Sequence, residues 1–311
     1  MPLRFTLRQL EYFLAVAENG SIAAASEKVN VSSPSISTAI VQLEEEFGLQ
    51  LFIRKHAHGL SLTQGGKQFT EQARNVLAEA IWLNSLANDI TGKVRGPLNV
   101  GCLLTFAQII LPQLRRRFVD KYTEVEFHQF QNTQIELFEN LRKASLDIAL
   151  TYDLNIPPDL EFIPLASLPP YALMALNHPL AHLESVSAKE LVEHPMILLD
   201  LPVSAEYFHS FFDGIGQKPN IIERTRDMAV MQSLVANGFG YSLANIRPKS
   251  DQAPDGKKLR VVPLTGPVRP MKVGLLFSEG MQASLTVRSF IEHCKLHITQ
   301  ESDFGLTVKL D

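Results

Sequence analysis

Short hydroxyl and amide side chains cover one face of a predicted helix near the start of this 311-residue chain. The stretch "VSSPSISTAIVQLEEEFG" (31–48) offers Ser33 as an N-cap, Pro34 at the first helical position and Gly48 as the end of the helix. Small polar side chains let a helix approach the floor of a DNA groove and hydrogen-bond base edges or phosphates. A solvated helix that is rich in serine by chance has the same pattern, so this helix alone leaves both interpretations open. The polar face consists of Pro34, Ser35, Thr38 and Gln42, with Ser37 at its edge, and the opposite face of Ile36, Ile40, Leu43 and Phe47.

Two shorter helices are predicted upstream. An amphipathic helix over 6–18 begins with a Thr6–Gln9 capping box, and an alanine-rich helix follows over 21–29. The second and third helices are joined by "NVS", which is typical of a helix-turn-helix. In that motif the N-terminal residues of the later helix face base edges.

A hairpin is predicted directly after the third helix. The run 49–63 alternates apolar residues on both sides of a turn at His58-Gly59. Its tip would present Arg54 and His56 to a nearby phosphate backbone. A metal site at His56 and His58 is disfavoured, because no third ligand lies near them in the sequence.

Together, residues 20–66 resemble the DNA-binding domain of the LysR-type transcriptional regulators. They share that family's helix-turn-helix, its "LEEE-G--LF-R" segment and its "G--LT--G" exit from the wing. Members often have Gln at the position of Ser33 and Arg at that of Thr38, so a bidentate arginine–guanine contact is missing here. The resemblance and the face of the helix together predict DNA-binding residues Ser33, Pro34, Ser35, Ser37, Thr38, Gln42, Arg54 and His56. We expect Ser35, Ser37, Thr38 and Gln42 to face bases and the others to lie near phosphates or the minor groove.

The charge of this segment is low for a DNA-binding domain. The whole chain has a formal net charge of −4. Residues 1–63 hold five Lys and Arg against six Glu, which sums to −1. Binding must then depend on cations at the wing, on helix N-termini and on more than one subunit.

A long helix is predicted over 64–91, followed by a hinge over 92–97 ("GKVRGP"). Its apolar residues repeat in steps of 4 and 3, which is typical of a seam that pairs with a second chain. The resemblance implies a homodimer, joined further into a homotetramer. The seam comprises Phe69, Ala73, Val76, Ala80, Leu83, Ala87 and Ile90.

Residues 98–311 alternate between strand-like and helix-like runs, which predicts an α/β fold with a parallel or mixed sheet interrupted by another. The resemblance implies an effector-binding domain of two Rossmann-like lobes, similar to a periplasmic binding protein. We assign lobe I to 98–162 plus 268–298, and lobe II to 163–267. The domains are therefore a winged helix-turn-helix over 1–63, the linker helix, the hinge and this effector domain.

Several predicted helix starts in this domain carry hydroxyl groups. Capping-box patterns pair Thr105 with Gln108, Thr133 with Glu136 and Ser187 with Glu190, and each hydroxyl has a structural role as a cap. Hydroxyls and helix dipoles would also suit a small carboxylate effector, with Arg224, Arg226 or Arg247 as a source of charge. By the family pattern, the effector cleft is lined by Leu103, Leu104, Thr105, Phe106, Thr133, Leu201, Pro202 and Ser204. Cys102 ends a predicted buried strand, and both inert packing and redox sensing remain open for it.

Other protein classes fit less well. The "GYSLA" run (240–244) lacks the last glycine of a G-x-S-x-G nucleophile elbow and follows a helix instead of preceding one, which argues against a hydrolase. A solute-binding protein that senses or carries a small organic acid without reading DNA is the alternative, but it leaves the wing and the seam unexplained. Two distant cysteines, the lack of an export signal and the lack of a membrane-length apolar run predict a cytoplasmic protein.

The sequence thus predicts a non-enzymatic DNA-binding transcriptional regulator with no resident cofactor or metal. Its expected partners are double-stranded promoter DNA, a small-molecule effector, further copies of itself and RNA polymerase. The effector would shift an equilibrium between two arrangements of the oligomer and so change DNA bending and polymerase access.

Overall fold

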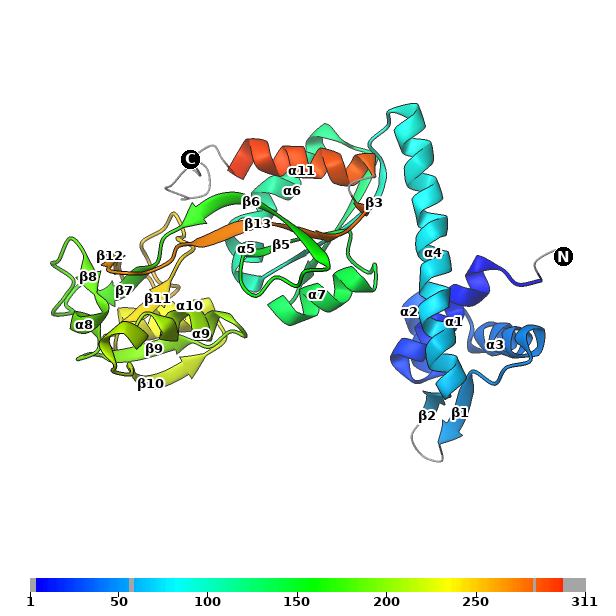
Figure 1. Ribbon diagram of the computed structural model, residues 1–311, viewed down its shortest axis with the longest axis horizontal. Coiled ribbons are helices and arrows are strands. Elements are labelled where there is room, and N and C mark those ends of the chain that lie inside the picture. The colour runs from blue at the N-terminus through cyan, green and yellow to red at the C-terminus, as the bar shows by residue number, and fades with distance from the viewer. Residues whose placement is uncertain (1–3, 56–58, 282–283, 299–311) are drawn as a thin grey trace. The chain divides into compact units, whose positions relative to one another are not determined.

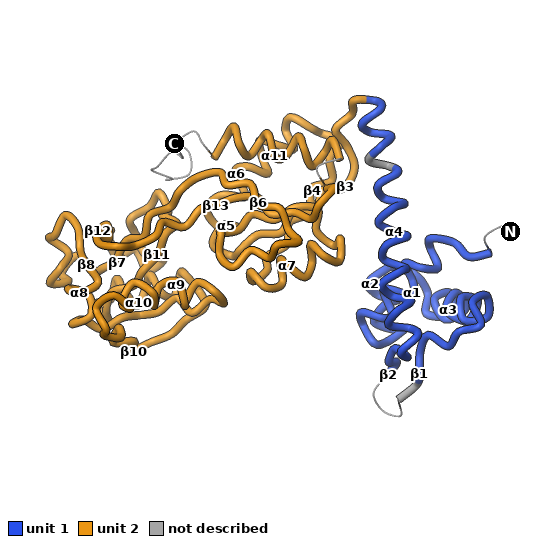
Figure 2. The backbone as a smooth tube through the Cα atoms, viewed as in Figure 1, with its two compact units in different colours: residues 1–91 blue, residues 92–311 orange. Residues whose placement is uncertain are grey.

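The computed structural model of the protein describes residues 4–55, 59–281 and 284–298 (Figure 1). The chain forms two compact units, residues 1–91 and 92–311 (Figure 2). No helix in the described part of the chain is long and apolar enough to cross a membrane.

The first unit is a helix-turn-helix domain with a two-stranded wing. Its helices pack around one apolar core that includes Phe13, Val16, Ile36 and Leu43, none of which is exposed. The elements in order are α1 (Leu7–Asn19), α2 (Ile22–Val29), α3 (Ser33–Phe47), β1 (Phe52–Lys55), β2 (Gly59–Leu62) and α4 (Gln64–Thr91).

Caps fix where these helices start. The predicted Thr6–Gln9 capping box of α1 is confirmed, since Thr6 Oγ1 accepts from Gln9 N and Gln9 Oε1 accepts from Thr6 N. The predicted cap of α3 is wrong by one residue, because Ser32 takes the extended backbone and its Oγ accepts from Ser35 N. Pro34 is consequently the second helical residue, which it tolerates because N–H groups of the first turn have no partner within the helix.

The first lobe of the second unit is built on a five-stranded mixed sheet in the order β4-β3-β5-β13-β6. Strand β3 runs parallel to its neighbours β4 and β5, and β13 runs antiparallel to β5 and β6. The strands are β3 (Gly96–Cys102), β4 (Val125–Gln131), β5 (Ile148–Tyr152), β6 (Leu160–Leu168) and β13 (Met271–Ser278), and the helices are α5 (Leu104–Ile109), α6 (Leu111–Lys121), α7 (Gln134–Arg142) and α11 (Leu285–Ile298).

The helix-like run over residues 105–122 forms two helices, not one. The backbone turns at Ile110, which has φ −107° and ends α5 before α6 begins. Pro112 accounts for this break, because it has no N–H to donate to Gln108 and its ring would clash with that carbonyl in a continuous helix.

The second lobe contains two groups of strands, in the orders β11-β7-β12-β8 and β10-β9. A parallel bridge between Met196 and Tyr241 joins them, and Ile197 N donates to Tyr241 O at 2.8 Å. The strands are β7 (Tyr171–Ala175), β8 (Val186–Ser187), β9 (Pro195–Leu199), β10 (Asn220–Thr225), β11 (Ser242–Ala244) and β12 (Leu259–Thr265), and the helices are α8 (Ala188–Leu191), α9 (Ser204–Ser210), η1 (Asp213–Ile215) and α10 (Met228–Ala236).

Strands β6 and β13 connect the two lobes and lie side by side (Figure 1). Their antiparallel pairing continues from Ser278–Leu160 to Met271–Leu168. Residues 163–168, which we had assigned to the second lobe, therefore belong to the sheet of the first. The expected hinge over 92–97 is also shorter, since β3 already begins at Gly96.

Candidate functional site

Helix α3 presents the expected polar face to solvent. Pro34, Ser35, Thr38 and Gln42 are exposed, whereas Ser33 and Ser37 are partly buried at the edges of this face. On the opposite side Ile36, Ile40 and Leu43 are buried in the core. Phe47 was expected to join them but is 42 % exposed, because it lies at the end of the helix; its ring packs against those of Phe5 and Phe69.

Hydrogen bonds orient two side chains on this face. Ser35 Oγ lies 2.8 Å from Ser32 Oγ, within the first turn of α3. Gln42 Oε1 accepts from Gln9 Nε2 of α1 at 2.8 Å. Because the side-chain oxygen of Gln42 already accepts this hydrogen bond, its NH₂ group remains to donate to another partner.

The exposed face also includes Val41, which the sequence analysis missed. Its side chain is 47 % exposed, although it is apolar. It follows Thr38 by three residues and precedes Gln42, so helical periodicity alone places it on the same side. An apolar group at this place could contact the methyl group of a thymine.

The wing is held to α3 by Glu44. Its Oε1 accepts from Leu51 N at 2.7 Å and from Phe52 N at 3.1 Å, at the point where the chain enters β1. On the other strand Leu60 N donates to Gly20 O at 2.8 Å. A Cβ at the neighbouring Gly59, which has φ +79°, would lie 2.5 Å from the same carbonyl oxygen, so only glycine fits there.

Two predicted wing residues have no described side chain. Arg54 lies in β1 opposite Leu60. His56 lies outside the described residues.

The apolar seam predicted along α4 serves two purposes. Its first residues, Phe69 and Ala73, pack into the core of the first unit. From Val76 onward the large seam residues are exposed within one chain, with Leu83 64 % and Ile90 78 % accessible. Only the later part of the seam is therefore free to pair with another chain.

The second unit has a cavity of about 300 Å³ lined by residues of both lobes. Its walls come from the ends of strands β3, β4, β5, β9 and β11, as expected for the carboxyl edge of such sheets. About half of the wall residues are apolar, among them Leu199, Phe208, Met228 and Met271. Of the residues predicted to line an effector cleft, this wall includes Leu103, Leu104, Thr105, Thr133, Leu201, Pro202 and Ser204.

Phe106 is not a wall residue of this cavity. It is fully buried, and its ring centroid lies 4.7 Å from that of Tyr152, which does line the cavity. Its neighbour Thr105 is also not the predicted N-cap, because α5 starts after Leu103 without a side-chain cap. Phe106 thus supports the wall from behind.

Side chains of the protein already cap the helix that begins at the cavity, α7. Thr133 and Glu136 form the predicted capping box of α7, and Glu136 Oε2 accepts from Thr133 N at 2.7 Å and from Thr133 Oγ1 at 2.9 Å. These hydrogen bonds lower the pKa of Glu136. A carboxylate thus already occupies the N-terminus of α7, which leaves less attraction there for an anionic ligand. Ser187 and Glu190 form the same box at α8, as predicted.

Arg226 is the cation among the described residues that line the cavity. It is exposed, whereas Arg224 forms an ion pair with Asp200 at 3.3 Å. Arg247 is not among the lining residues. Of the three arginines considered from the sequence, Arg226 is the one that an anionic group in this cavity can reach.

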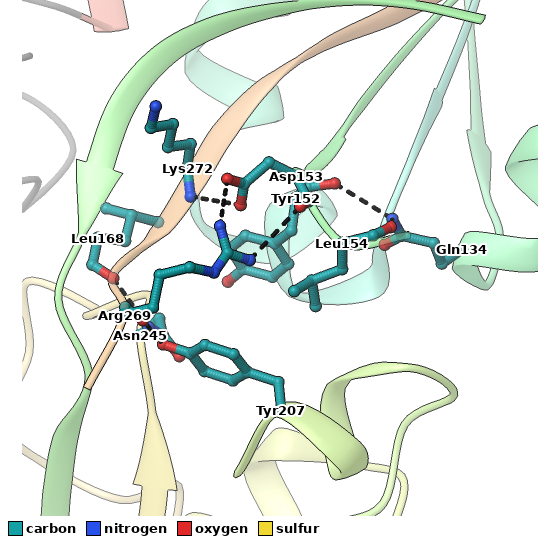
Figure 3. A network of polar contacts seen from close by, with 9 residues as sticks. All are labelled: Gln134, Tyr152, Asp153, Leu154, Leu168, Tyr207, Asn245, Arg269 and Lys272. Carbon is teal, nitrogen blue, oxygen red and sulfur yellow. Dashed lines mark hydrogen bonds and ion pairs between the residues drawn. The ribbon is translucent and has the colours of Figure 1, made fainter. Parts of the chain in front are cut away.

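A polar network connects the cavity to the strands that join the lobes (Figure 3). Asn245, a cavity residue, donates through Nδ2 to Leu168 O at 2.8 Å and to Tyr207 Oη at 2.9 Å. Tyr207 Oη donates to Arg269 O at 2.6 Å, and Arg269 Nη1 pairs with Asp153 Oδ2 at 2.7 Å. On the lobe I side the buried Gln134 donates through Nε2 to Leu154 O at 2.8 Å.

Cys102 is a packed core residue at the end of β3. It has no exposed surface, and burial raises the pKa of its thiol to about 12. A thiol in this state is a poor nucleophile, because the thiolate is the reactive form. Cys102 is also not part of the cavity wall, so packing accounts for it.

The GYSLA segment does not form a nucleophile elbow. Helix α10 ends before Gly238, and the strand β11 follows it. Ser242 is fully buried in that strand. The nucleophile elbow requires the opposite order and an exposed serine.

Comparison with known proteins agrees with both units. The family described as "Bacterial regulatory helix-turn-helix protein, lysR family" matches residues 7–67, and the "LysR substrate binding domain" matches residues 91–298. The transcriptional regulator CysB of Haemophilus influenzae is 25 % identical, over 94 % of this chain and 91 % of its own length.

Solved structures show the same fold. HinK, a LysR family transcriptional regulator from Pseudomonas aeruginosa, is 35 % identical, with a TM-score of 0.63 over 94 % of this chain and 99 % of its own. Full-length CbnR in complex with its target DNA is 22 % identical, with a TM-score of 0.63 over 94 % and 99 % of the two chains. The winged helix-turn-helix, the two-lobed α/β unit and these similarities together place the chain in the LysR family of transcriptional regulators.

Proposed function

We propose that this LysR-type regulator reads promoter DNA with the exposed face of α3. The observation that carries the proposal is that Pro34, Ser35, Thr38, Val41 and Gln42 form a continuous exposed face while the rest of α3 is buried in the core. Small side chains permit close approach to the groove, and the amide of Gln42 is oriented to donate. Ser33 and Ser37 flank this face, and Arg54 and His56 of the wing would approach the phosphate backbone.

A homodimer is the unit that we propose to bind. One domain with a net charge of −1 over residues 1–63 attracts DNA weakly, so two copies reading half-sites related by a two-fold axis are needed. The exposed apolar residues of α4, Trp82, Leu83, Leu86 and Ile90, supply a surface for pairing. Pairs of dimers would form the tetramer, and the assembly would act in the cytoplasm by altering the access of RNA polymerase.

The cavity between the lobes is the proposed effector site. Members of this family bind small-molecule effectors there, and here the wall combines apolar side chains with one arginine, Arg226. A small organic acid suits such a wall, with its carboxylate at Arg226. The effector can shift the regulator between two arrangements only by the difference in its affinity for them.

Binding to the DNA upstream of the regulator's own gene tests the DNA-binding proposal. The measurement is a titration at several salt concentrations against random-sequence competitor. We expect binding that is at least about 10³-fold tighter than to random DNA, with a steep salt dependence.

Variants on α3 sharpen this test. Thr38→Ala and Gln42→Ala should each weaken binding to the operator by about tenfold and leave binding to random DNA unchanged. Gln217→Ala, at an exposed glutamine of the second lobe, is the matched control. Equal losses on both DNAs, or no loss at all, would remove the α3 face from sequence recognition.

A further inference from the structure

Three residues of the effector cavity hold oxygen atoms that are shielded from solvent and make no hydrogen bond of good geometry within the described residues, although Thr105 lies near enough to the Tyr152 hydroxyl to affect it. They are Thr105 Oγ1 and Asn132 Oδ1 of the first lobe and Asn245 Oδ1 of the second. An unpaired buried oxygen carries a desolvation cost that a suitable partner removes. Three of them in the wall of one cavity point to a ligand that supplies the missing hydrogen bonds.

The chemistry of Asn245 defines what that partner must be. Its Nδ2 donates to the carbonyl oxygen of Leu168, which can only accept, so the amide cannot exchange its two ends. The second contact of Nδ2, to Tyr207 Oη, is consistent with this orientation because the tyrosine proton goes to Arg269 O. Asn245 Oδ1 is thus a fixed acceptor, and a carboxylate, which can only accept, cannot satisfy it.

Asn132 directly follows β4 and is held there by its backbone. Its backbone N donates to Cys102 O at 3.0 Å, which sets the side chain next to the loop that begins α5. A hydroxyl or amine group would donate to Asn132 or Asn245, and a hydroxyl would in addition accept from Thr105. Since these residues come from different lobes, such a ligand has polar contacts to both.

We propose that the effector carries, besides a carboxylate at Arg226, at least one hydroxyl or amine donor on an apolar body, and that Asn245, Asn132 and Thr105 recognise this donor. The proposal rests on the assignment of the cavity as the effector site. A ligand reaches the shielded oxygens by displacing wall side chains, of which Met228 and Met271 are the most adaptable. An organic acid without a donor group leaves the oxygens unpaired and binds weakly.

Matched pairs of probes test this with the full-length protein. The hydroxylated probes are 3-hydroxybenzoate, 4-hydroxybenzoate and 4-hydroxyphenylacetate, and each is compared by calorimetry with the fluoro analogue, which has nearly the same size but no donor. We expect at least one hydroxylated acid to bind about tenfold or more tightly than its analogue. The fluoro compound binding equally well or better in every pair would overturn the proposal.

Variants then assign the preference to the named residues. Asn245→Leu and Asn132→Leu replace the whole amide at nearly constant shape, whereas Thr105→Val removes only the hydroxyl and leaves the hydrogen bonds of Asn245 intact. At least one of them should reduce the preference for the hydroxylated acid to about one, whereas Arg226→Gln should weaken both members of the pair alike. A preference that survives in all three variants contradicts the proposed recognition.

The same samples are assayed for binding to operator DNA, which separates this proposal from the proposed function. If operator binding is intact but no hydroxylated acid binds, the donor requirement fails and the regulatory function stands. If operator binding is also absent, the proposed function is wrong, and the effector proposal that rests on it falls with it.

Discussion

The hydroxyl of Tyr207 lies 2.9 Å from Asn245 Nδ2 and donates to the backbone carbonyl of Arg269 at 2.6 Å. A wall residue of the cavity is thereby tied through α9 to the segment that leads back into β13 (Figure 3). Arg269 in turn pairs with Asp153 of the first lobe at 2.7 Å. The cavity and the connection between the lobes therefore share one hydrogen-bonded network.

Replacing Tyr207 by phenylalanine should destabilise this network without opening a void. Tyr207 is buried, and loss of its hydroxyl group leaves Arg269 O without that donor and Asn245 Nδ2 with one acceptor fewer. We expect the free energy of unfolding to fall by about 1–2 kcal/mol, measured by urea denaturation of the full chain.

Tyr122→Phe serves as the control, because the ring of Tyr122 packs on Phe118 while its hydroxyl makes no hydrogen bond among the described residues. Equal stability of the two variants would show that the Tyr207 hydroxyl does not support the connection.

Local sequence patterns predicted most of the first unit. The 3.6-residue periodicity and the Thr6–Gln9 capping box mark α1 correctly, and the alternation of apolar residues marks the wing. The cap of α3 was misplaced because Ser32 and Ser33 are chemically equivalent. Only the backbone conformation decides which of them lies outside the helix.

The cavity was harder to predict, because its walls meet through long-range packing. In the short helix α5, Thr105 and Phe106 are neighbours in the sequence, yet one lines the cavity and the other supports it from behind. Asn132 and Asn245 were missed. Both directly follow strands, at the carboxyl edge where ligands bind in such sheets, and this was the signal available in the sequence.

Val41 should contribute to the choice of base pair through a thymine methyl group. Its exposed side chain lies beside Thr38 and Gln42 on the α3 face. Val41→Ala should weaken operator binding by about fivefold, the equivalent of roughly 1 kcal/mol for a buried methyl contact.

Operators with single thymine-to-uracil replacements identify the contact, because uracil lacks only that methyl group. At one position in the operator, Val41→Ala and the uracil replacement together should weaken binding no more than either change alone. Additive losses at every position would mean that Val41 touches no thymine methyl group.

Glu44 should stabilise the attachment of the wing. Its carboxylate accepts two backbone hydrogen bonds, from Leu51 N and Phe52 N, and Glu44→Ala leaves both donors without this partner. We expect the free energy of unfolding of the first unit to fall by about 2 kcal/mol. Thermal unfolding of the full chain measures this loss. Glu45→Ala, at an exposed position of the same helix, is the control, and an equal shift in Tm for both variants would contradict the role of Glu44.

His293 should make the second unit less stable in acid. Its Nε2 donates to Leu114 O at 3.0 Å, because a carbonyl can only accept. Burial is the main cause that lowers the pKa of His293 to about 4; the side chain of His297 and the nearby cations Lys121 and Arg117 act in the same direction, against the opposing effect of the Leu114 hydrogen bond. The rings of Phe118 and Phe290 pack against it and offer no counter-charge.

The sign of the effect follows from proton uptake. Between about pH 6.5 and 4 the unfolded chain binds a proton at this imidazole and the folded chain does not, so stability is complete above that window and falls as the pH decreases through it. The shift corresponds to about 3 kcal/mol. Urea denaturation at several pH values measures it. His293→Gln keeps a donor for Leu114 O but cannot titrate, so it should show a clearly shallower loss of stability between pH 6.5 and 4. The same slope in the variant and in the unmodified protein would mean that His293 is not the residue responsible.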